Sequence, residues 1–436
     1  MKKAIIVGGN QGGLNMARCL AEAGFSVEVF EKKERGDVAY DWTDDMDPKI
    51  FEELGLPLPD ESGWFHKKDW TFVNPNESIK LFVKGGAQAG DLSMYRRPLN
   101  EYFYNLIKDK ENVTVHYGKK VERLVLADDK VVGVTVDGVR IPSDLVVDCG
   151  GAHSEIRESL PESFGIPTRP NPGETFVAYR GFFKPKEGVE EPKYTNKAYL
   201  QHIGEKGISW CIYGEGMVDI LIGRIDKLTK EDIDRGLAAL KKDNPILSDE
   251  LIKCGFCSII PVRYPISKMV ADGYVLCGDS AYMTIPLMGS GMFCSLLCGK
   301  MLAEVLQKDD DCGEKNLWNY QLKFYDRFGA YCGVDVLKRW LLSAEAKDID
   351  FLFEKGIFDE KIMGNGVGGD PIKLSFGEIL KKAWQGKSRI GLLLKIVGML
   401  GDSDKVNAIA KKIPQEYDRE KIAAWQKELD GFFNND

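Results

Sequence analysis

The sequence lacks the features by which several classes of protein are recognised. Lysine and arginine are outnumbered by aspartate and glutamate, so the formal net charge is -8 and the pI is near 5.4. A nucleic-acid-binding surface needs a basic excess, and we therefore expect no nucleic-acid partner. No apolar run approaches the roughly 20 residues that span a bilayer. Met1-Lys2-Lys3 leads straight into an apolar run without a signal peptide, which predicts a cytoplasmic protein.

Histidine is scarce, and cysteines form no compact framework. The four histidines form no visible pair, and the ten cysteines are scattered, as is typical of a reducing compartment. Cys254 and Cys257 have a C-x-x-C spacing, which is compatible with ordinary thiols, a disulfide relay that admits electrons, or zinc. A structural zinc site needs four ligands and no second pair is present, so we predict no metal site. Cys294 and Cys298, one helical turn apart, are predicted to be packing residues.

The first thirty residues carry the strongest pattern in the chain. A short apolar run at 5–7 leads into a glycine-rich turn, an alanine-rich helix at 17–23, a second apolar run at 27–30, and then Glu31. Strand, glycine turn, helix, strand and a final acid about twenty residues after the turn form a βαβ dinucleotide-binding unit.

The chemistry of this unit follows from its turn. Glycines let the backbone approach a pyrophosphate, whose charge the N–H groups and positive dipole end of the helix stabilise. The middle position of G-x-G-x-x-G is Asn10, for which the additional Gly9 and Gly12 can compensate. Glu31 is expected to accept hydrogen bonds from the adenosine ribose. The predicted cofactor-binding residues here are Gly8, Gly9, Asn10, Gln11, Gly12, Gly13, Glu31 and Lys32.

Two later segments, 145–157 and 274–306, repeat the order of strand, glycine turn and helix. In the second, Asp279 leaves a strand where its carboxylate can hold a polyol. Gly289 and Gly291 let the backbone meet a flat ring at the start of an apolar helix at 293–306. The predicted cofactor-binding residues of this segment are Gly278, Asp279, Pro286, Gly289, Gly291 and Met292.

Together, in this order and spacing, these segments resemble the FAD-binding framework of para-hydroxybenzoate hydroxylase-type flavoproteins. Residues 7–13 with Glu31 resemble its ADP-binding motif, and Arg96 followed by Leu99 matches its arginine-x-x-Leu/Phe element. Residues 149–157 resemble its Asp-Gly stretch, and Gly278 with Asp279 its Gly-Asp motif. The resemblance covers about the first 300 residues.

Within that superfamily the sequence is most similar to the geranylgeranyl reductase family, flavoenzymes that saturate isoprenoid double bonds. Residues 207–214 are similar to the family's aromatic-x-Trp-x-Phe-Pro strand, and 278–292 to its Gly-Asp-Ala-Ala through Gly-Gly-Gly-Ile stretch. The resemblance implies that Trp210 and Tyr213 line the substrate cavity. It implies that FAD contacts Gly12, Gly13, Glu31, Arg96, Val121, Asp279, Gly291 and Met292.

The implied fold class is α/β, with a Rossmann-like FAD-binding domain, a β-rich substrate domain and a C-terminal helical region. The FAD-binding domain is discontinuous and comprises 1–163 and 268–306. The β-rich domain comprises 164–267, which 64–95 can join, and the helical domain comprises 307–436.

The departures from the family pattern bear on the electron donor. Gly150 stands where the Asp-Gly element has the aspartate that the hydroxylases link to both FAD and NAD(P)H. Direct reduction by a nicotinamide is therefore in question, and a reductase or ferredoxin-like protein is an alternative donor. Tyr213 replaces the expected proline, and the loop 40–45 has no cysteine of the kind that some of these reductases place near the flavin.

The resemblance implies reduction of C=C bonds in a prenyl chain or another elongated apolar substrate, with hydride from reduced flavin. Tyr213, Tyr282 and Tyr40 are the candidate proton donors. An FAD-dependent aromatic-type monooxygenase is an alternative, and a flavin-bearing electron carrier is another. The apolar run 390–400, flanked by basic residues, either packs against the FAD lobe or forms an interfacial helix that gives peripheral membrane contact.

Overall fold

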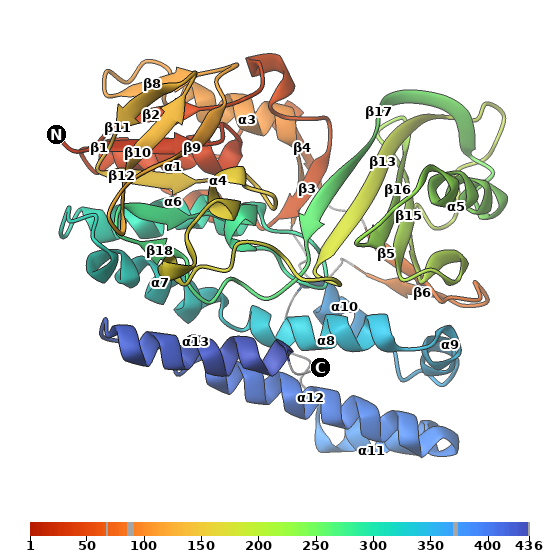
Figure 1. Ribbon diagram of the computed structural model, residues 1–436. Helices are drawn as coiled ribbons and strands as arrows, with labels where there is room; N and C mark the ends of the chain where they lie inside the picture. The colour runs from red at the N-terminus through yellow and green to blue at the C-terminus, as the bar shows by residue number, and fades with distance from the viewer. Residues whose placement is uncertain (67–68, 85–90, 369–373, 435–436) are drawn as a thin grey trace.

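The computed structural model describes residues 1–66, 69–84, 91–368 and 374–434. Figure 1 shows two β-lobes side by side, with the C-terminal helices below both. The first lobe contains a six-stranded sheet of order β18-β19-β12-β1-β2-β8, in which all neighbours except β18 and β19 are parallel. Its strands are β1 (Lys3–Val7), β2 (Ser26–Phe30), β8 (Val113–His116), β12 (Leu145–Asp148), β18 (Val270–Ala271) and β19 (Tyr274–Leu276).

Helices cover this sheet because its strands are apolar on both faces, as in other parallel sheets. Helix α1 packs on α6, and the Asn15 amide donates to the Leu296 carbonyl at 2.8 Å to fix the pair. Between β8 and β12, three antiparallel strands form a separate small sheet. The elements are α1 (Gln11–Glu22), α3 (Arg96–Asn105), α4 (Glu155–Glu158), α6 (Met292–Leu306), α7 (Glu314–Phe328), β9 (Val121–Ala127), β10 (Lys130–Val136) and β11 (Val139–Pro142).

The second lobe is a seven-stranded sheet of order β17-β13-β16-β15-β14-β5-β6. Helix α5 (Lys230–Asp243) packs on one face, and the other face lines the cavity described below. Of the segment 64–95, β5 and β6 join this sheet, and 67–68 and 85–90 lie outside the described residues. The strands are β5 (Trp70–Val73), β6 (Lys80–Val83), β13 (Thr175–Pro185), β14 (Asn196–Leu200), β15 (Gly207–Gly214), β16 (Met217–Ile225) and β17 (Leu247–Pro261).

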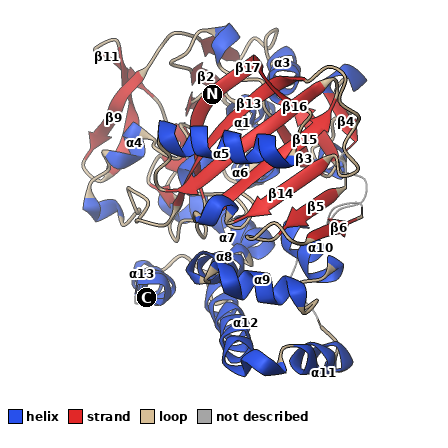
Figure 2. Ribbon diagram, turned by 90° about the vertical axis from the view of Figure 1, so that its right-hand side faces the viewer, coloured by secondary structure: helices blue, strands red, loops and turns tan. Residues whose placement is uncertain are grey.

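A three-stranded sheet of order β3-β7-β4 joins the lobes: it comprises β3 (Thr43–Met46), β4 (Trp64–His66) and β7 (Leu92–Tyr95), and helix α2 (Lys49–Glu53) follows β3. The C-terminal helices continue below, where α8 packs on α12 and α12 on α13. Figure 2 shows α12 extending away from the sheets with α11 near its far end. These helices are α8 (Tyr331–Ser343), α9 (Ala346–Glu354), α10 (Glu360–Gly368), α11 (Phe376–Gln385), α12 (Ile390–Ala410) and α13 (Arg419–Asn434).

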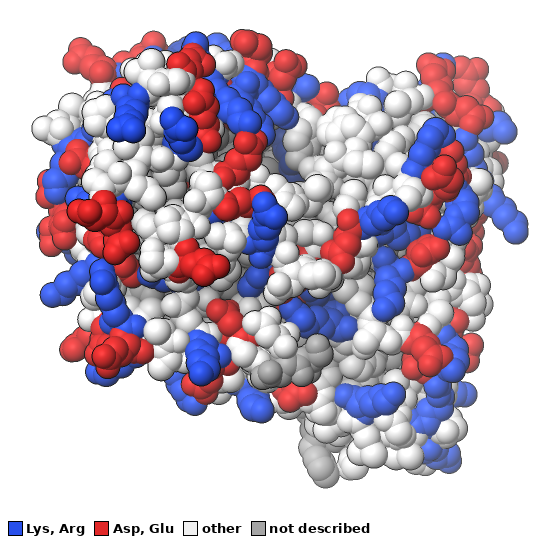
Figure 3. Space-filling view, viewed as in Figure 1, with Lys and Arg blue, Asp and Glu red and all other residues white. Residues whose placement is uncertain are grey.

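Among the described helices, none combines the length and apolar character needed to cross a bilayer. Over the face seen in Figure 3, positive and negative side chains are interspersed.

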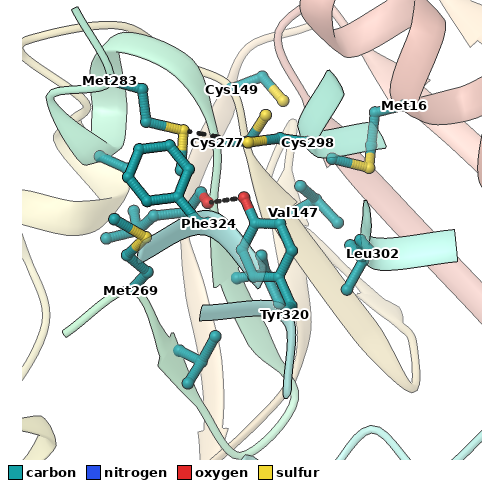
Figure 4. Packing of buried hydrophobic residues seen from close by; sticks show 14 of the residues in the cluster. Met16, Val147, Cys149, Met269, Cys277, Met283, Cys298, Leu302, Tyr320 and Phe324 are labelled. Carbon is teal, nitrogen blue, oxygen red and sulfur yellow. Dashed lines mark hydrogen bonds between the residues drawn. The ribbon is translucent and has the colours of Figure 1, made fainter. Parts of the chain in front are cut away.

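Sulfur-containing side chains pack where the parallel sheet meets α6 and α7 (Figure 4). The Cys298 thiol lies 3.5 Å from the Met283 sulfur, and Cys149 and Cys277 lie close by. Cys294 and Cys298 are both fully buried, in the position of small hydrophobic side chains. Burial raises the pKa of the Cys294 thiol, so it stays protonated and unreactive.

Candidate active site

A single cavity of about 1390 Å³ runs between the two lobes and down to the C-terminal helices. One end is lined by the glycine turn after β1 and by the segments that follow β2 and β19. The middle is lined by the inner face of the seven-stranded sheet, and the far end by helices α8, α11 and α12.

The glycine turn has the close approaches that its sequence predicts. Gly8 has φ +109°, and a Cβ there would lie 2.6 Å from the Cys149 carbonyl oxygen. A Cβ on Gly13 would lie 2.0 Å from the Gly8 carbonyl oxygen. Asn10, the non-glycine middle position, caps α1 by accepting from the Gly13 N–H at 3.1 Å and donates to the Cys149 carbonyl at 2.8 Å. Asn10 therefore ties the turn to β12, which explains why an amide side chain fits there.

Glu31 closes the first unit beside the turn. One carboxylate oxygen accepts from the Gly9 N–H at 2.8 Å and the other from the Lys33 N–H at 2.9 Å. The carboxylate is buried and lines the cavity. Each oxygen retains a further lone pair, so Glu31 can still accept from a hydroxyl group.

Arg96, the first residue of α3, lies in the cavity wall. Its guanidinium forms a bidentate pair with Asp44 of β3, with one N–H to Oδ1 at 2.8 Å. The same group lies 4.8 Å from the centroid of the Tyr40 ring and 5.3 Å from that of Trp42. This aromatic and acidic surround holds the cation in one place while leaving it exposed to the cavity.

Asp279 follows β19 and faces the same space. Burial raises the pKa of its carboxyl to about 6, and the positive charge of Arg96 opposes that shift. Helix α6 begins at Met292, and its N-cap residue is Gly291, which has no side chain to accept from the first N–H groups of the helix. The N-terminal N–H groups of α6 are therefore available to a ligand.

The structure brings most of the predicted cofactor residues to the cavity. Those that line it are Gly8, Asn10, Gln11, Gly12, Glu31, Lys32, Arg96, Val121, Gly278, Asp279, Gly289, Gly291 and Met292. Gly9, Gly13 and Pro286 are absent from its lining. Gly9 and Gly13 act instead through their backbone, which holds Glu31 and the helix cap.

These residues fit FAD. A helix N-terminus behind glycines suits a pyrophosphate, Glu31 suits a ribose, and Asp279 suits a polyol chain. The positions are also crowded: a Cβ on Gly291 would lie 2.5 Å from the Met283 carbonyl oxygen and one on Gly12 2.8 Å from the Ser295 hydroxyl. Glycine at these two positions therefore avoids a clash with the neighbouring Met283 and Ser295.

The middle of the cavity contains an ion pair that is not among the residues predicted from the sequence. Arg180 on β13 and Asp219 on β16 form a bidentate pair at 2.9 and 2.6 Å, and Arg180 also donates to Thr43. The Arg180 guanidinium lies 5.2 Å from the Trp210 ring, whose N–H is 3.4 Å from Asp219. The sequence signal is an arginine and an aspartate, each within a mainly apolar strand, and the two pair diagonally across the sheet.

Trp210 and Tyr213 lie on opposite faces of β15. Trp210 lines the cavity with Ile208 and Ile212. Tyr213 instead packs against the cluster under α5, and its hydroxyl donates to Glu191 at 3.2 Å. The predicted roles of Tyr213 as substrate contact and proton donor conflict with this position, because side chains three residues apart in a strand point to opposite faces.

Tyr282 is also displaced from the predicted role. Its side chain is fully buried outside the cavity lining, and the guanidiniums of Arg157 and Arg263 lie 4.6 and 4.7 Å from its ring centroid. Its geometry is that of a structural residue held between two cations.

Tyr40 alone of the three predicted tyrosines lines the cavity. Its hydroxyl lies 3.3 Å from the Ser258 hydroxyl of β17. Cys254, nearby on the same strand, is a free thiol half-buried against the Tyr40–Trp42 cluster, and Cys257 is free and exposed.

The far end of the cavity is mostly apolar, although Lys382 and Asn407 also line it. It is enclosed by helix side chains that have no counterpart among the predicted site residues. They include Val334, Leu337, Leu341, Leu393, Ile396, Met399 and Leu400.

Comparison with known proteins identifies relatives over the whole chain. A digeranylgeranylglycerophospholipid reductase from Sulfolobus acidocaldarius is 22% identical over 98% of this chain and 96% of its own. An FAD-dependent monooxygenase from Penicillium shearii is 26% identical over 70% of this chain and 68% of its own. The squalene epoxidase family model matches residues 245–377.

A solved structure shares the fold. The geranylgeranyl bacteriochlorophyll reductase-like protein from Thermoplasma acidophilum superposes with a TM-score of 0.72 at 19% identity, over 90% of this chain and 99% of that one. The predicted framework of a Rossmann-type FAD-binding fold with a β-rich lobe is confirmed. The predicted resemblance to geranylgeranyl-type reductases agrees with these comparisons, because the chain is similar to a digeranylgeranylglycerophospholipid reductase over nearly its whole length and shares the fold of a geranylgeranyl reductase-like protein.

Proposed function

We propose that this protein uses FAD to reduce carbon–carbon double bonds in a prenyl chain or a similarly elongated apolar substrate. The observation that carries the proposal is the continuity of the cavity. Gly12, Arg96 and Asp279 line one end of the same space that the aliphatic side chains of α8 and α12 line at the other. Its volume of about 1390 Å³ exceeds the roughly 300–1,000 Å³ of a usual ligand pocket, which leaves room for a long chain beside a cofactor.

The relatives support a lipid substrate. The Sulfolobus acidocaldarius protein, which aligns over nearly the whole chain, is a digeranylgeranylglycerophospholipid reductase. The far end of the cavity offers an isoprenoid a wall of aliphatic carbon from Leu337, Leu393 and Ile396, with the favourable transfer free energy of apolar burial.

When bound and reduced, FAD supplies the hydride. The chain positions the substrate and supplies the proton. Trp42 and Trp210 present aromatic faces to the middle of the cavity, where they exclude water from the reacting carbons. We assign proton donation to the Tyr40 hydroxyl, because it lines the cavity and Ser258 lies close enough to orient it.

We infer that electrons come from a reductase or ferredoxin-like protein. A Cβ on Gly150 would lie 3.0 Å from the Asp148 carboxylate and 3.1 Å from the Ser154 hydroxyl. An aspartate at this position, as the hydroxylases have, would therefore be crowded and would face a second carboxylate. Anaerobic stopped-flow mixing with NADPH and with reduced ferredoxin tests this, and rapid bleaching of the flavin by NADPH alone would contradict it.

The substrate is tested by photoreducing the purified protein without oxygen and adding a geranylgeranyl lipid. We expect the oxidised flavin absorbance to return and mass spectrometry to show a product heavier by two hydrogens for each bond reduced. A fully saturated lipid of the same length is the matched control and should leave the flavin reduced.

Two results would favour the other readings of the fold. Rapid reoxidation by oxygen coupled to a hydroxylated product would indicate a monooxygenase. Reoxidation by a protein partner alone, with every prenyl lipid unchanged, would indicate an electron carrier.

A further inference from the structure

Helices α11 and α12 expose a concentration of large apolar side chains. Figures 1 and 2 show these helices at the lower end of the molecule, on the side away from the sheets. Trp384 is 70% exposed, Leu394 64% and Val397 62%. We define the α11–α12 face as Ile379, Leu380, Trp384, Ile390, Leu394 and Val397.

The same helices carry a local basic excess in an acidic protein. Residues 376–400 contain five lysines or arginines and one acid, Glu378, whereas the whole chain has a formal charge of -8. Lys381, Lys387 and Lys395 are exposed, and the Lys387 ammonium lies 4.5 Å from the centroid of the Trp384 ring. Helices that lie in a membrane interface typically combine tryptophan and lysine with aliphatic side chains, as α11 and α12 do.

The cavity reaches the surface at this face. Leu393, Ile396 and Leu400 of α12 and Ala383 of α11 line its far end. Val397 does so too, although it is 62% exposed. A molecule at the α11–α12 face is therefore next to the apolar end of the active-site cavity.

We propose that the α11–α12 face docks on the surface of a bilayer that contains anionic lipids, with both helices lying flat, and that the substrate chain enters the cavity between them. The second half of this proposal rests on the proposed function, and the docking does not. The basic residues select a membrane over a second copy of this chain, because an identical surface would bring like charges together. The exposed apolar side chains favour a bilayer over an acidic protein, because an acidic protein would bind the lysines without covering those side chains.

The test is flotation of the FAD-loaded protein with vesicles of phosphatidylcholine and phosphatidylglycerol. We expect the protein to float with these vesicles and less with phosphatidylcholine alone. W384S combined with L394S should weaken binding at least about tenfold, because both side chains are exposed on the α11–α12 face that the bilayer would cover. K387Q combined with K395Q should weaken it by about fivefold per lysine, and only on anionic vesicles.

Leu126 and Val139, which are 38% and 63% exposed on the small antiparallel sheet, provide the matched control. L126S combined with V139S should float as the unmodified protein does. The W384S/L394S protein should keep its FAD and its turnover of a detergent-dispersed short prenyl substrate, which shows that it is folded.

Three results would overturn the docking. The unmodified protein would not bind vesicles, or the W384S/L394S protein would bind them equally well. The third result is light scattering that shows the unmodified protein as a dimer and the W384S/L394S protein as a monomer, because the face would then be an interface between two copies of the chain. Failure of the proposed reaction would leave vesicle binding intact, so the two proposals fail separately.

Discussion

On the dinucleotide-binding side, the wall of the cavity is rich in backbone turns and charged groups, whereas on the side of the C-terminal helices most of the lining side chains are apolar. The first wall depends on Gly8 and Gly12, where an added Cβ would lie 2.6 and 2.8 Å from a neighbouring oxygen, and on the Arg96–Asp44 pair, which has a hydrogen bond of 2.8 Å. The second depends on residues such as Leu337 and Met399, which contact a ligand only through van der Waals forces. The first wall therefore selects one particular cofactor, whereas the second wall selects a substrate only by its length and its apolar character.

The sharpest test of this difference compares glycines. G13A would bring a Cβ to 2.0 Å from the Gly8 carbonyl oxygen, so we expect loss of FAD and a cost of about 3 kcal/mol in the free energy of unfolding. G391A on α12 meets nothing within 4 Å and should stabilise the protein by up to about 1 kcal/mol. Urea unfolding and flavin content measure both, and equal effects would erase the distinction.

Charges in the first wall come next in size. R96M leaves the Asp44 carboxylate, whose side chain is only 14% exposed, without its partner, so we expect a loss of about 3 kcal/mol in the free energy of unfolding and weaker FAD binding. R97M breaks the neighbouring pair with Asp41, which is largely exposed, and should cost less than about 1 kcal/mol. Thermal unfolding of the two variants measures this difference. Similar losses of stability would show that the Arg96–Asp44 pair contributes no more than the exposed pair.

The carboxyl of Asp279 gives this wall a pH dependence. Burial raises its pKa to about 6 in the folded protein, above the 3.8 that is ordinary for an aspartate carboxyl. The folded state then binds more protons than the unfolded state between these values, so stability falls as the pH rises from about 4 to 6. We expect the FAD-free protein to lose about 2 kcal/mol over this range relative to D279N, measured by urea unfolding. Parallel curves for the two proteins would contradict the raised pKa.

The smallest effect is expected where the second lobe meets the substrate. W210A removes a wall side chain and should raise the KM for a prenyl substrate about tenfold, with FAD retained. Y213A, on the opposite face of the same strand, should leave kcat and KM within about twofold. Steady-state kinetics of both variants are the measurement. An equal rise in KM for Y213A would indicate that Tyr213 does contact the substrate.

The motifs of the first wall could be predicted because each has a local physical cause. The turn at Gly8, the acid at Glu31 and the aspartate after β19 are short-range patterns, and the structure brings them together. The period of two in a strand could also have excluded a shared role for Trp210 and Tyr213, since three positions separate opposite faces.

The rest of the site has no local pattern. Arg180 and Asp219 lie on strands whose pairing is set by tertiary structure. The helices that close the far end come from more than 300 residues along the chain. The sequence of an amphipathic helix shows which of its residues form the apolar face. It does not show which of those residues line a cavity and which are exposed to solvent.

The interruption of the parallel sheet has a consequence for biosynthesis. Strand β12 pairs with β19, although a whole β-lobe, residues 164–267, separates them in the chain. A ribosome therefore releases the glycine turn early but Gly278 and Asp279 only after that lobe has emerged. Pairing of such distant segments is slow because of the entropy of loop closure. We infer that the nascent chain acquires its cofactor late, when the second lobe can already fold, and that truncation before residue 276 leaves an uncovered parallel edge prone to aggregation.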